Sequence, residues 1–149
     1  MEKLVLNKNL IGKEYPIVIC KIKKEMLLAF AEATEQVDLI YFDEKTALEN
    51  GHPTIIAPPT FLTVIAMQQD NPYEYLNNIN IPLSRVLHAG QEYSYYQPVY
   101  VGDEIRMKYK IEDIYERKNG EITFIDFRST YTNQNNIKVA KSLSTLAIR

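Results

Sequence analysis

The fold is decided by three stretches in the last third of the chain: GDEIRMKYKIED (102–113), EITFIDFRSTYT (121–132) and IKVAKSLSTLAI (137–148). Apolar and charged residues alternate along the first stretch, which predicts a long, half-buried strand. The second stretch is rich in β-branched and aromatic residues, which favour strands. Turn signals separate the three, at Lys118-Asn119-Gly120 and at Asn133–Asn136. Strands linked by such short turns form an antiparallel sheet.

A fourth extended segment, LHAGQEYSYYQPVYVGD (87–103), precedes these strands and is interrupted by Pro98. Side chains in a strand alternate between the two faces of its sheet. An uninterrupted alternation puts His88 on one face together with Glu92 and Ser94. It puts Gln91, Tyr93 and Tyr95 on the opposite face.

The first half of the chain has helical patterns instead. KKEMLLAFAEAT (23–34) predicts an amphipathic helix, and Asp43 is a helix cap for EKTALEN (44–50). FLTVIAMQQ (61–69) follows two prolines and is apolar on every side, which predicts a buried helix. A long sheet needs a covering layer, and this helix is the candidate for it. We therefore predict a single α+β domain over residues 1–149, a long curved antiparallel sheet wrapped round one buried central helix.

Composition excludes several classes of function. The chain has 17 Lys and Arg against 19 Asp and Glu, a net charge of −2, which argues against a nucleic-acid partner. One cysteine and two histidines exclude an intramolecular disulfide and the usual metal sites, and no glycine-rich phosphate loop occurs. No cofactor is expected. The apolar runs are too short to span a membrane and the N-terminus lacks a signal-peptide core, so we expect a cytoplasmic protein.

The predicted architecture is that of the hot-dog fold, and two segments resemble one family with that fold. These are FAEATEQVDLIYFDEKTALENGHPTIIAPPTFL (30–62), with its Ala-Pro-Pro-Thr-Phe run at 57–61, and LHAGQEYSYYQPVYVGDEI (87–105). They resemble MaoC-like (R)-specific hydratases and dehydratases. The resemblance is to the N-terminal, FAS1-like dehydratase branch, which includes non-catalytic subunits of (3R)-hydroxyacyl-ACP dehydratases. It implies an acyl-CoA or acyl-ACP thioester as the ligand.

Catalytic members of that family carry a loop like Phe-Ala-x-x-Thr-Gly-Asp-x-Asn-Pro-x-His, whose Asp and His activate one water. Their positions correspond to Gln36 and Tyr41 here. An amide cannot act as a base, and the ordinary tyrosine pKa of about 10 suits a neutral-pH base poorly. The glycine N–H that polarises the thioester carbonyl corresponds to Pro59, which has no N–H. The resemblance thus implies a degenerate site, with side chains 36 and 41 expected at one cavity mouth beside the central helix.

Two residues are candidate substitutes for the missing base, His88 and Asp38. We expect the substrate-binding residues to be Ala57, Pro58, Pro59, Thr60, His88, Gln91 and Tyr93.

Three functions remain open. The chain binds an acyl thioester while a second MaoC-like subunit supplies the catalytic residues, or it is an active dehydratase or enoyl hydratase with non-standard residues. The third possibility is a hot-dog acyl-CoA thioesterase, whose carboxylate base would be Glu32, Glu35 or Asp38. In each case the exposed sheet edge and the resemblance imply a homodimer or a heterodimer with a second hot-dog subunit.

Overall fold

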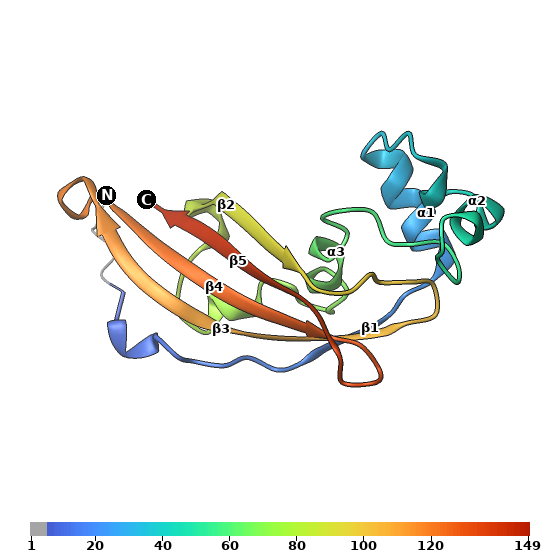
Figure 1. The fold of residues 1–149 in the computed structure, drawn as a ribbon. Helices are drawn as coiled ribbons and strands as arrows, with labels where there is room; N and C mark the ends of the chain where they lie inside the picture. The colour runs from blue at the N-terminus through green and yellow to red at the C-terminus, as the bar shows by residue number, and fades with distance from the viewer. Residues whose placement is uncertain (1–5) are drawn as a thin grey trace.

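The computed structural model describes residues 6–149, which form one five-stranded antiparallel sheet with helices against it (Figure 1). The sheet order is β1-β3-β4-β5-β2, so β1 and β2 form its two edges. The strands are β1 (Val18–Lys21), β2 (Val86–Tyr95), β3 (Glu104–Arg117), β4 (Ile122–Thr132) and β5 (Lys138–Ile148). The predicted hairpins β3–β4 and β4–β5 are confirmed.

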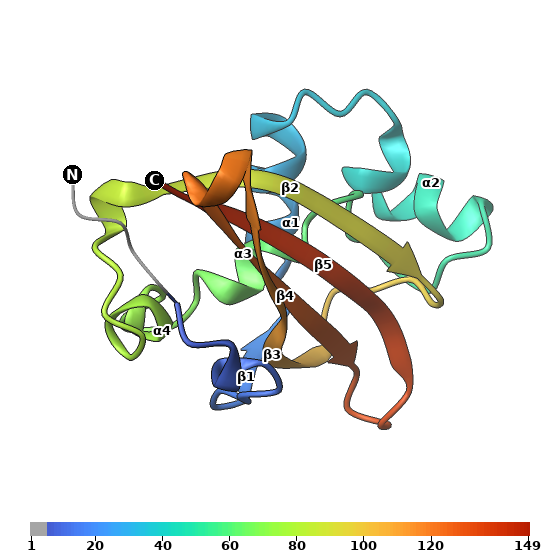
Figure 2. The ribbon, with the colours of Figure 1, turned by 90° about the vertical axis from the view of Figure 1, so that its left-hand side faces the viewer.

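The helices are short. They are α1 (Lys24–Ala33), α2 (Glu44–Glu49), α3 (Thr63–Ala66) and α4 (Glu74–Asn77), with 3-10 turns η1 (Lys8–Leu10), η2 (Leu39–Tyr41), η3 (Leu83–Arg85) and η4 (Lys118–Gly120). Helices α1 and α2 form a lobe beyond one end of the sheet, whereas α3 and α4 lie nearer its middle and its other end (Figures 1 and 2).

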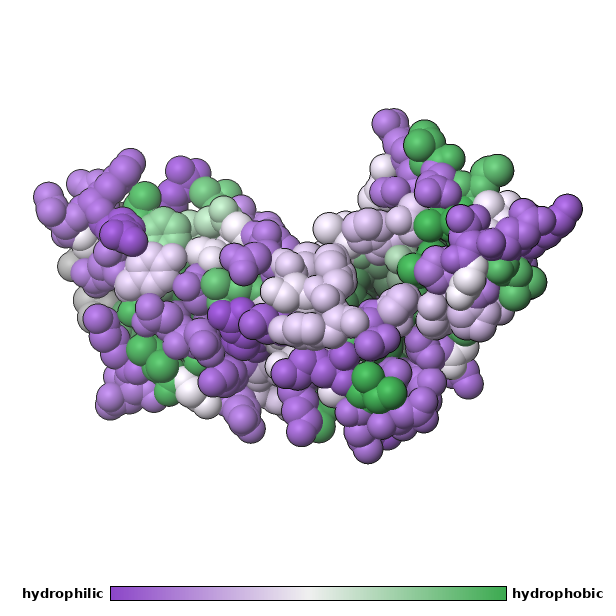
Figure 3. Space-filling view, viewed as in Figure 1, coloured by the Kyte–Doolittle hydropathy of each residue, from purple (hydrophilic) through white to green (hydrophobic). Residues whose placement is uncertain are grey.

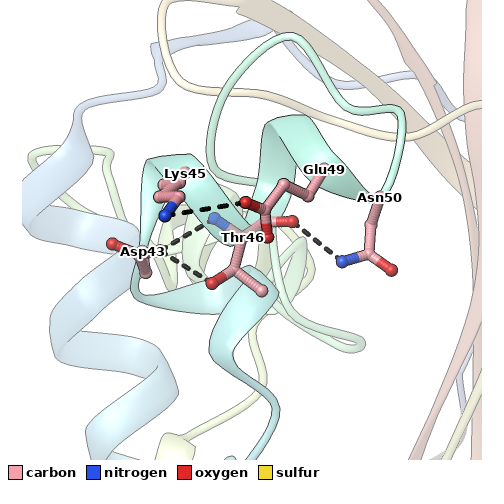
Figure 4. A network of polar contacts seen from close by, with 5 residues as sticks. All are labelled: Asp43, Lys45, Thr46, Glu49 and Asn50. Carbon is pink, nitrogen blue, oxygen red and sulfur yellow. Dashed lines mark hydrogen bonds and ion pairs between the residues drawn. The ribbon is translucent and has the colours of Figure 1, made fainter.

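The predicted cap of α2 is confirmed. The Asp43 carboxylate accepts hydrogen bonds from the Thr46 backbone N–H at 2.8 Å and from the Thr46 hydroxyl at 2.7 Å (Figure 4). Both hydrogen bonds lower the pKa of Asp43, and the bond from the Thr46 hydroxyl has the larger effect. At the other end of the helix the Asn50 side chain donates to the Thr46 carbonyl, and Gly51 takes a positive φ of 83°. The helix therefore begins and ends where the sequence signals place it.

The helix expected over residues 61–69 is shorter and less buried than predicted. Thr60 has a φ of 66°, a left-handed conformation, so no helix runs from the two prolines into this segment. Helix α3 covers only Thr63–Ala66. Phe61, Leu62 and Ile65 are buried in the core, but Met67 is 47% exposed. The apolar composition of this segment thus reflects one buried side and one partly exposed side, a correction to the all-round burial that we expected.

The face assignment in β2 also needs correction. His88 pairs with Leu146 and Gly90 with the next residue of β5, Thr145. Ala89, between His88 and Gly90, has no counterpart on β5 and forms a β-bulge. The extra residue, Ala89, shifts the alternation by one. His88 therefore lies on the same face as Gln91 and Tyr93, not with Glu92.

Candidate functional site

A cavity of about 410 Å³ lies between the concave face of the sheet and helices α3 and α4. Its floor comes from β3, β4 and β5, one side from β2, and its cover from residues of α3 and α4 and the segments beside them. The lining residues that matter below are Thr63, Met67, Tyr75, His88, Gln91, Tyr93, Tyr109, Phe127, Ser129, Tyr131, Ser142 and Ser144.

The cavity exists because small side chains interrupt the apolar floor. Along the inward face of β4, Ser129 lies between Phe127 and Tyr131, and Ser129 pairs with Ser142 of β5. Phe127 belongs to one buried cluster of the core and Tyr131 to the other. The serines, including Ser144, do not fill the space between these clusters, and the concave face of the sheet is hollow there.

Hydroxyl groups give the cavity fixed polar points. The Tyr93 hydroxyl shares a hydrogen bond of 2.6 Å with Thr63 Oγ1, and the Tyr131 hydroxyl shares one of 3.3 Å with Ser142 Oγ. Burial raises the pKa of both tyrosines. These hydroxyls are therefore protonated at neutral pH and suit orientation of a ligand rather than proton abstraction.

His88 is the one imidazole of this cavity, and no carboxylate orients it. Its Nε2 lies 3.2 Å from Gln91 Oε1, which only accepts hydrogen bonds, so Nε2 carries the proton in this contact. Glu92 lies on the other face of β2, and among residues 6–149 no Asp or Glu lines the cavity. The shared face that the sequence predicts for His88 and Glu92 is therefore wrong.

A second cavity, of about 340 Å³, lies where the chain enters the α3 segment. It is lined by Tyr41, Leu62, residues 56–59 and residues 95–99. In the view of Figure 3 the surface is notched between the α1–α2 lobe and the rest of the molecule, above α3 and the end of β2. Burial raises the pKa of Tyr41, and the nearby Asp38 raises it further, so its hydroxyl stays protonated at neutral pH.

Two consecutive backbone positions at this point offer no free donor. Pro59 has no N–H, and the N–H of Thr60 donates to the Tyr95 hydroxyl at 2.9 Å. A thioester carbonyl placed beside Pro59 would therefore find no N–H there, and the neighbouring N–H of Thr60 is already bonded to Tyr95.

Comparison with known proteins shows the family. Residues 9–142 match the protein-family model described as "FAS1-like, dehydratase domain region". The chain belongs to this family. A UPF0336 protein of Saccharopolyspora erythraea is 30% identical over 145 residues, which covers 97% of this chain and 92% of that protein.

Solved structures agree on the fold of this FAS1-like dehydratase chain. The HadBC (3R-hydroxyacyl-ACP dehydratase) complex of Mycobacterium tuberculosis has a TM-score of 0.77 at 22% identity, covering 90% of this chain and 92% of that one. The ChsH1-ChsH2 complex of Mycobacterium tuberculosis has a TM-score of 0.74 at 18% identity, covering 92% and 84%. The fold is the α+β hot-dog fold, as the sequence predicts.

The residues predicted to bind substrate divide between the two cavities. His88, Gln91 and Tyr93 line the first, and Ala57, Pro58 and Pro59 line the second. Thr60 lines neither but is held by Tyr95 beside the second.

Only one of the two dyad positions reaches a cavity. Tyr41 lines the second cavity with Pro59, whereas Gln36 does not, and its amide donates to Thr34 Oγ1 at 3.4 Å. The expected convergence of these two side chains is therefore wrong for Gln36. Asp38 accepts from the N–H of Ile40 at the start of η2. The carboxylates Glu32, Glu35 and Asp38 are all exposed and line neither cavity.

The serines of the floor and the rings of Tyr75, Tyr109 and Phe127 are functional candidates that only the structure reveals. The signal was present in β4 and β5, where serine occupies inward positions that the alternation reserves for apolar residues. Within residues 6–149, no group of three or more His, Cys, Asp or Glu could hold a metal ion, and no helix is long and apolar enough to cross a membrane.

Proposed function

We propose that this chain binds the acyl group of an acyl-CoA or acyl-ACP thioester and does no chemistry itself, while a second hot-dog subunit supplies the catalytic Asp and His. The observation that carries the proposal is the second cavity. It has a tyrosine in place of a base, a proline in place of an N–H donor, and the next N–H bonded to Tyr95. A dehydratase needs a base and a carbonyl-polarising donor around one reacting group.

The first cavity supports the binding half of the proposal. It is lined largely by rings and aliphatic groups with a few fixed hydroxyls, which is typical of a small-molecule site. Its volume suits an acyl chain.

The edge of the sheet supports the second subunit. β2 pairs only with β5, and most of its residues are exposed. Unpaired edges of this kind are normally covered in the assembled protein. The similarity to HadBC and to ChsH1-ChsH2, both complexes, agrees with a partner of the same fold.

Two measurements on the purified chain test the proposal. It should hydrate crotonyl-CoA and longer enoyl-CoAs no faster than background, and it should bind octanoyl-CoA in calorimetry. Ser144→Leu fills the cavity floor and should abolish this binding. Thr130→Leu is the matched control. Thr130 lies between Ser129 and Tyr131 on β4, and because neighbouring side chains of a strand point to opposite faces, it faces away from the cavity. Turnover near 1 per second or faster would overturn the proposal.

The partner is tested by reconstitution. A tagged copy of this chain, isolated from its native cells, should carry a second hot-dog protein whose sequence contains the intact Asp and His loop. Mixing the two purified subunits should raise turnover on enoyl thioesters well above that of the partner alone. Equal turnover with and without this chain would refute a joint function.

A second candidate is an active hydratase that uses His88. One observation favours it: the bulge in β2 turns His88 into the first cavity, where its ring meets Gln91. In that case the chain alone turns over enoyl-CoA and His88→Ala removes the activity. Gln91→Ala, which leaves the imidazole in place, should then retain most of it.

A further inference from the structure

We propose that Tyr75, Tyr109 and Phe127 form an end wall that sets the longest acyl chain the first cavity accepts. This inference rests on the proposed function, since it assumes that an acyl chain is the ligand. All three rings line the cavity. None of them stands at the positions of the catalytic Asp and His, and none takes part in the Tyr93–Thr63 or Tyr131–Ser142 hydrogen bond.

The sheet order gives the cavity a direction. None of the lining residues on β3, β4 and β5 is exposed, whereas the exposed ones lie on β2 and the covering segments, so the mouth is between the cover and β2. The exposed lining residues are Thr63, Met67, Tyr73, Leu83, His88 and Gln91. From β2 inward the next strands are β5, β4 and β3. A chain that enters beside β2 crosses the serines of β5, then meets Phe127 on β4 and Tyr109 on β3.

The rings at that inner side support one another. The centroid of Tyr75, from α4, lies 5.0 Å from Phe127 and 6.4 Å from Tyr109, both edge to face. Behind Tyr109, the buried ring of Tyr15 stacks at 5.1 Å and 9°. Packed rings in these arrangements resist displacement, so an apolar chain cannot push past them cheaply.

The consequence is a limit on length rather than on chemistry. Each methylene that enters the cavity gains free energy until the chain reaches the wall, and further methylenes stay in water or must bend. Removing one ring of the wall deepens the cavity and moves the limit to longer chains.

The test is a chain-length series, with binding of butanoyl-, octanoyl-, dodecanoyl- and hexadecanoyl-CoA measured by calorimetry. In Tyr75→Ala we expect binding of the first chain too long for the wild type to tighten by about tenfold or more, with the shortest chain unchanged. Tyr115→Ala is the matched control, since Tyr115 stacks on Phe124, lines neither cavity and loses the same ring. Tyr75→Leu, a milder truncation, provides the test if the alanine variant does not fold.

The outcomes separate the two proposals. Wild-type binding with the same length profile in folded Tyr75→Ala and Tyr75→Leu overturns the end wall and leaves acyl binding intact. An equal shift in Tyr115→Ala also overturns the end wall. If the wild type binds no acyl-CoA of any length, acyl binding itself is refuted, and the end wall with it.

Discussion

Tyr93 and Tyr95 stack on each other with ring centroids 5.6 Å apart and planes 15° apart, and each lines a different cavity. Their hydroxyls both bond to the segment that starts α3, Tyr93 to Thr63 Oγ1 and Tyr95 to the N–H of Thr60. These two stacked rings on one face of β2 thus lie between the cavities, and their hydroxyls hold the turn at Thr60–Thr63.

Removing the Tyr95 hydroxyl should destabilise the protein slightly. In Tyr95→Phe the ring and its stacking remain, but the Thr60 N–H loses its acceptor. Because Thr60 is exposed and water can replace the bond, we expect a loss of about 0.5 to 1 kcal/mol in the free energy of unfolding. Urea denaturation measures it. Tyr96→Phe is the control, since the Tyr96 ring contacts Lys138 but its hydroxyl has no hydrogen bond within residues 6–149. Equal losses in both variants would contradict the role given to Tyr95.

Thr60 itself should be a position where glycine stabilises. A β-branched residue at a φ of 66° is strained, by about 1 to 3 kcal/mol, whereas glycine adopts this conformation freely. Glycine also makes the unfolded chain more flexible, which offsets part of the gain. Thr60→Gly should therefore raise the free energy of unfolding by about 1 kcal/mol. Thr60→Ala keeps a Cβ and should gain less, so a larger gain from alanine would count against strain as the cause.

Much of the fold could be predicted because local signals agree with the final contacts. The cap at Asp43, the alternation in β3 and the turns at 118–120 and 133–136 each depend on neighbouring residues only. The errors arise where one residue departs from its local pattern. The extra residue at Ala89 reverses the faces of β2, and the left-handed Thr60 separates the two prolines from α3. Neither feature has a signature in composition or periodicity.

The candidate site was harder to predict than the fold for a physical reason. Its floor depends on Ser129 meeting Ser142, a pairing of two strands that the alternation within each strand does not specify. The two positions that correspond to the catalytic Asp and His, Gln36 and Tyr41, share one loop, but the structure brings only Tyr41 to a cavity. The sequence pattern therefore predicts the strands and helices, but the first cavity depends on the register between β4 and β5, which the pattern does not specify.

The one-sided burial of residues 61–67 predicts unequal effects of truncation. Phe61 is 1% exposed and its ring packs edge to face against Phe30 at 5.5 Å. Phe61→Ala should cost about 3 to 5 kcal/mol, because a large buried ring leaves a cavity. Met67→Ala, in the same segment but half exposed, should cost less than about 1 kcal/mol. Thermal and urea unfolding of the two variants measure the difference, and similar losses would show that Met67 is as well packed as Phe61.

The buried tyrosines predict a loss of stability in alkaline solution. Burial raises the pKa of Tyr15 and of Tyr75 from the ordinary value of 10 to about 12. Between these values the unfolded chain releases protons that the folded chain retains, so stability is fully present below about pH 10 and falls as the pH rises toward 12. Tyr15→Phe removes one such group and should make this fall less steep.

The Tyr15 hydroxyl is also buried without a hydrogen-bond partner in residues 6–149, so the variant should be as stable as the wild type or more stable at neutral pH. Urea unfolding across this pH range measures both effects, with Tyr96→Phe as the control from an exposed ring. A Tyr15→Phe variant that loses stability at neutral pH would show that the hydroxyl has a partner, and an unchanged alkaline slope would show that its burial does not govern the titration.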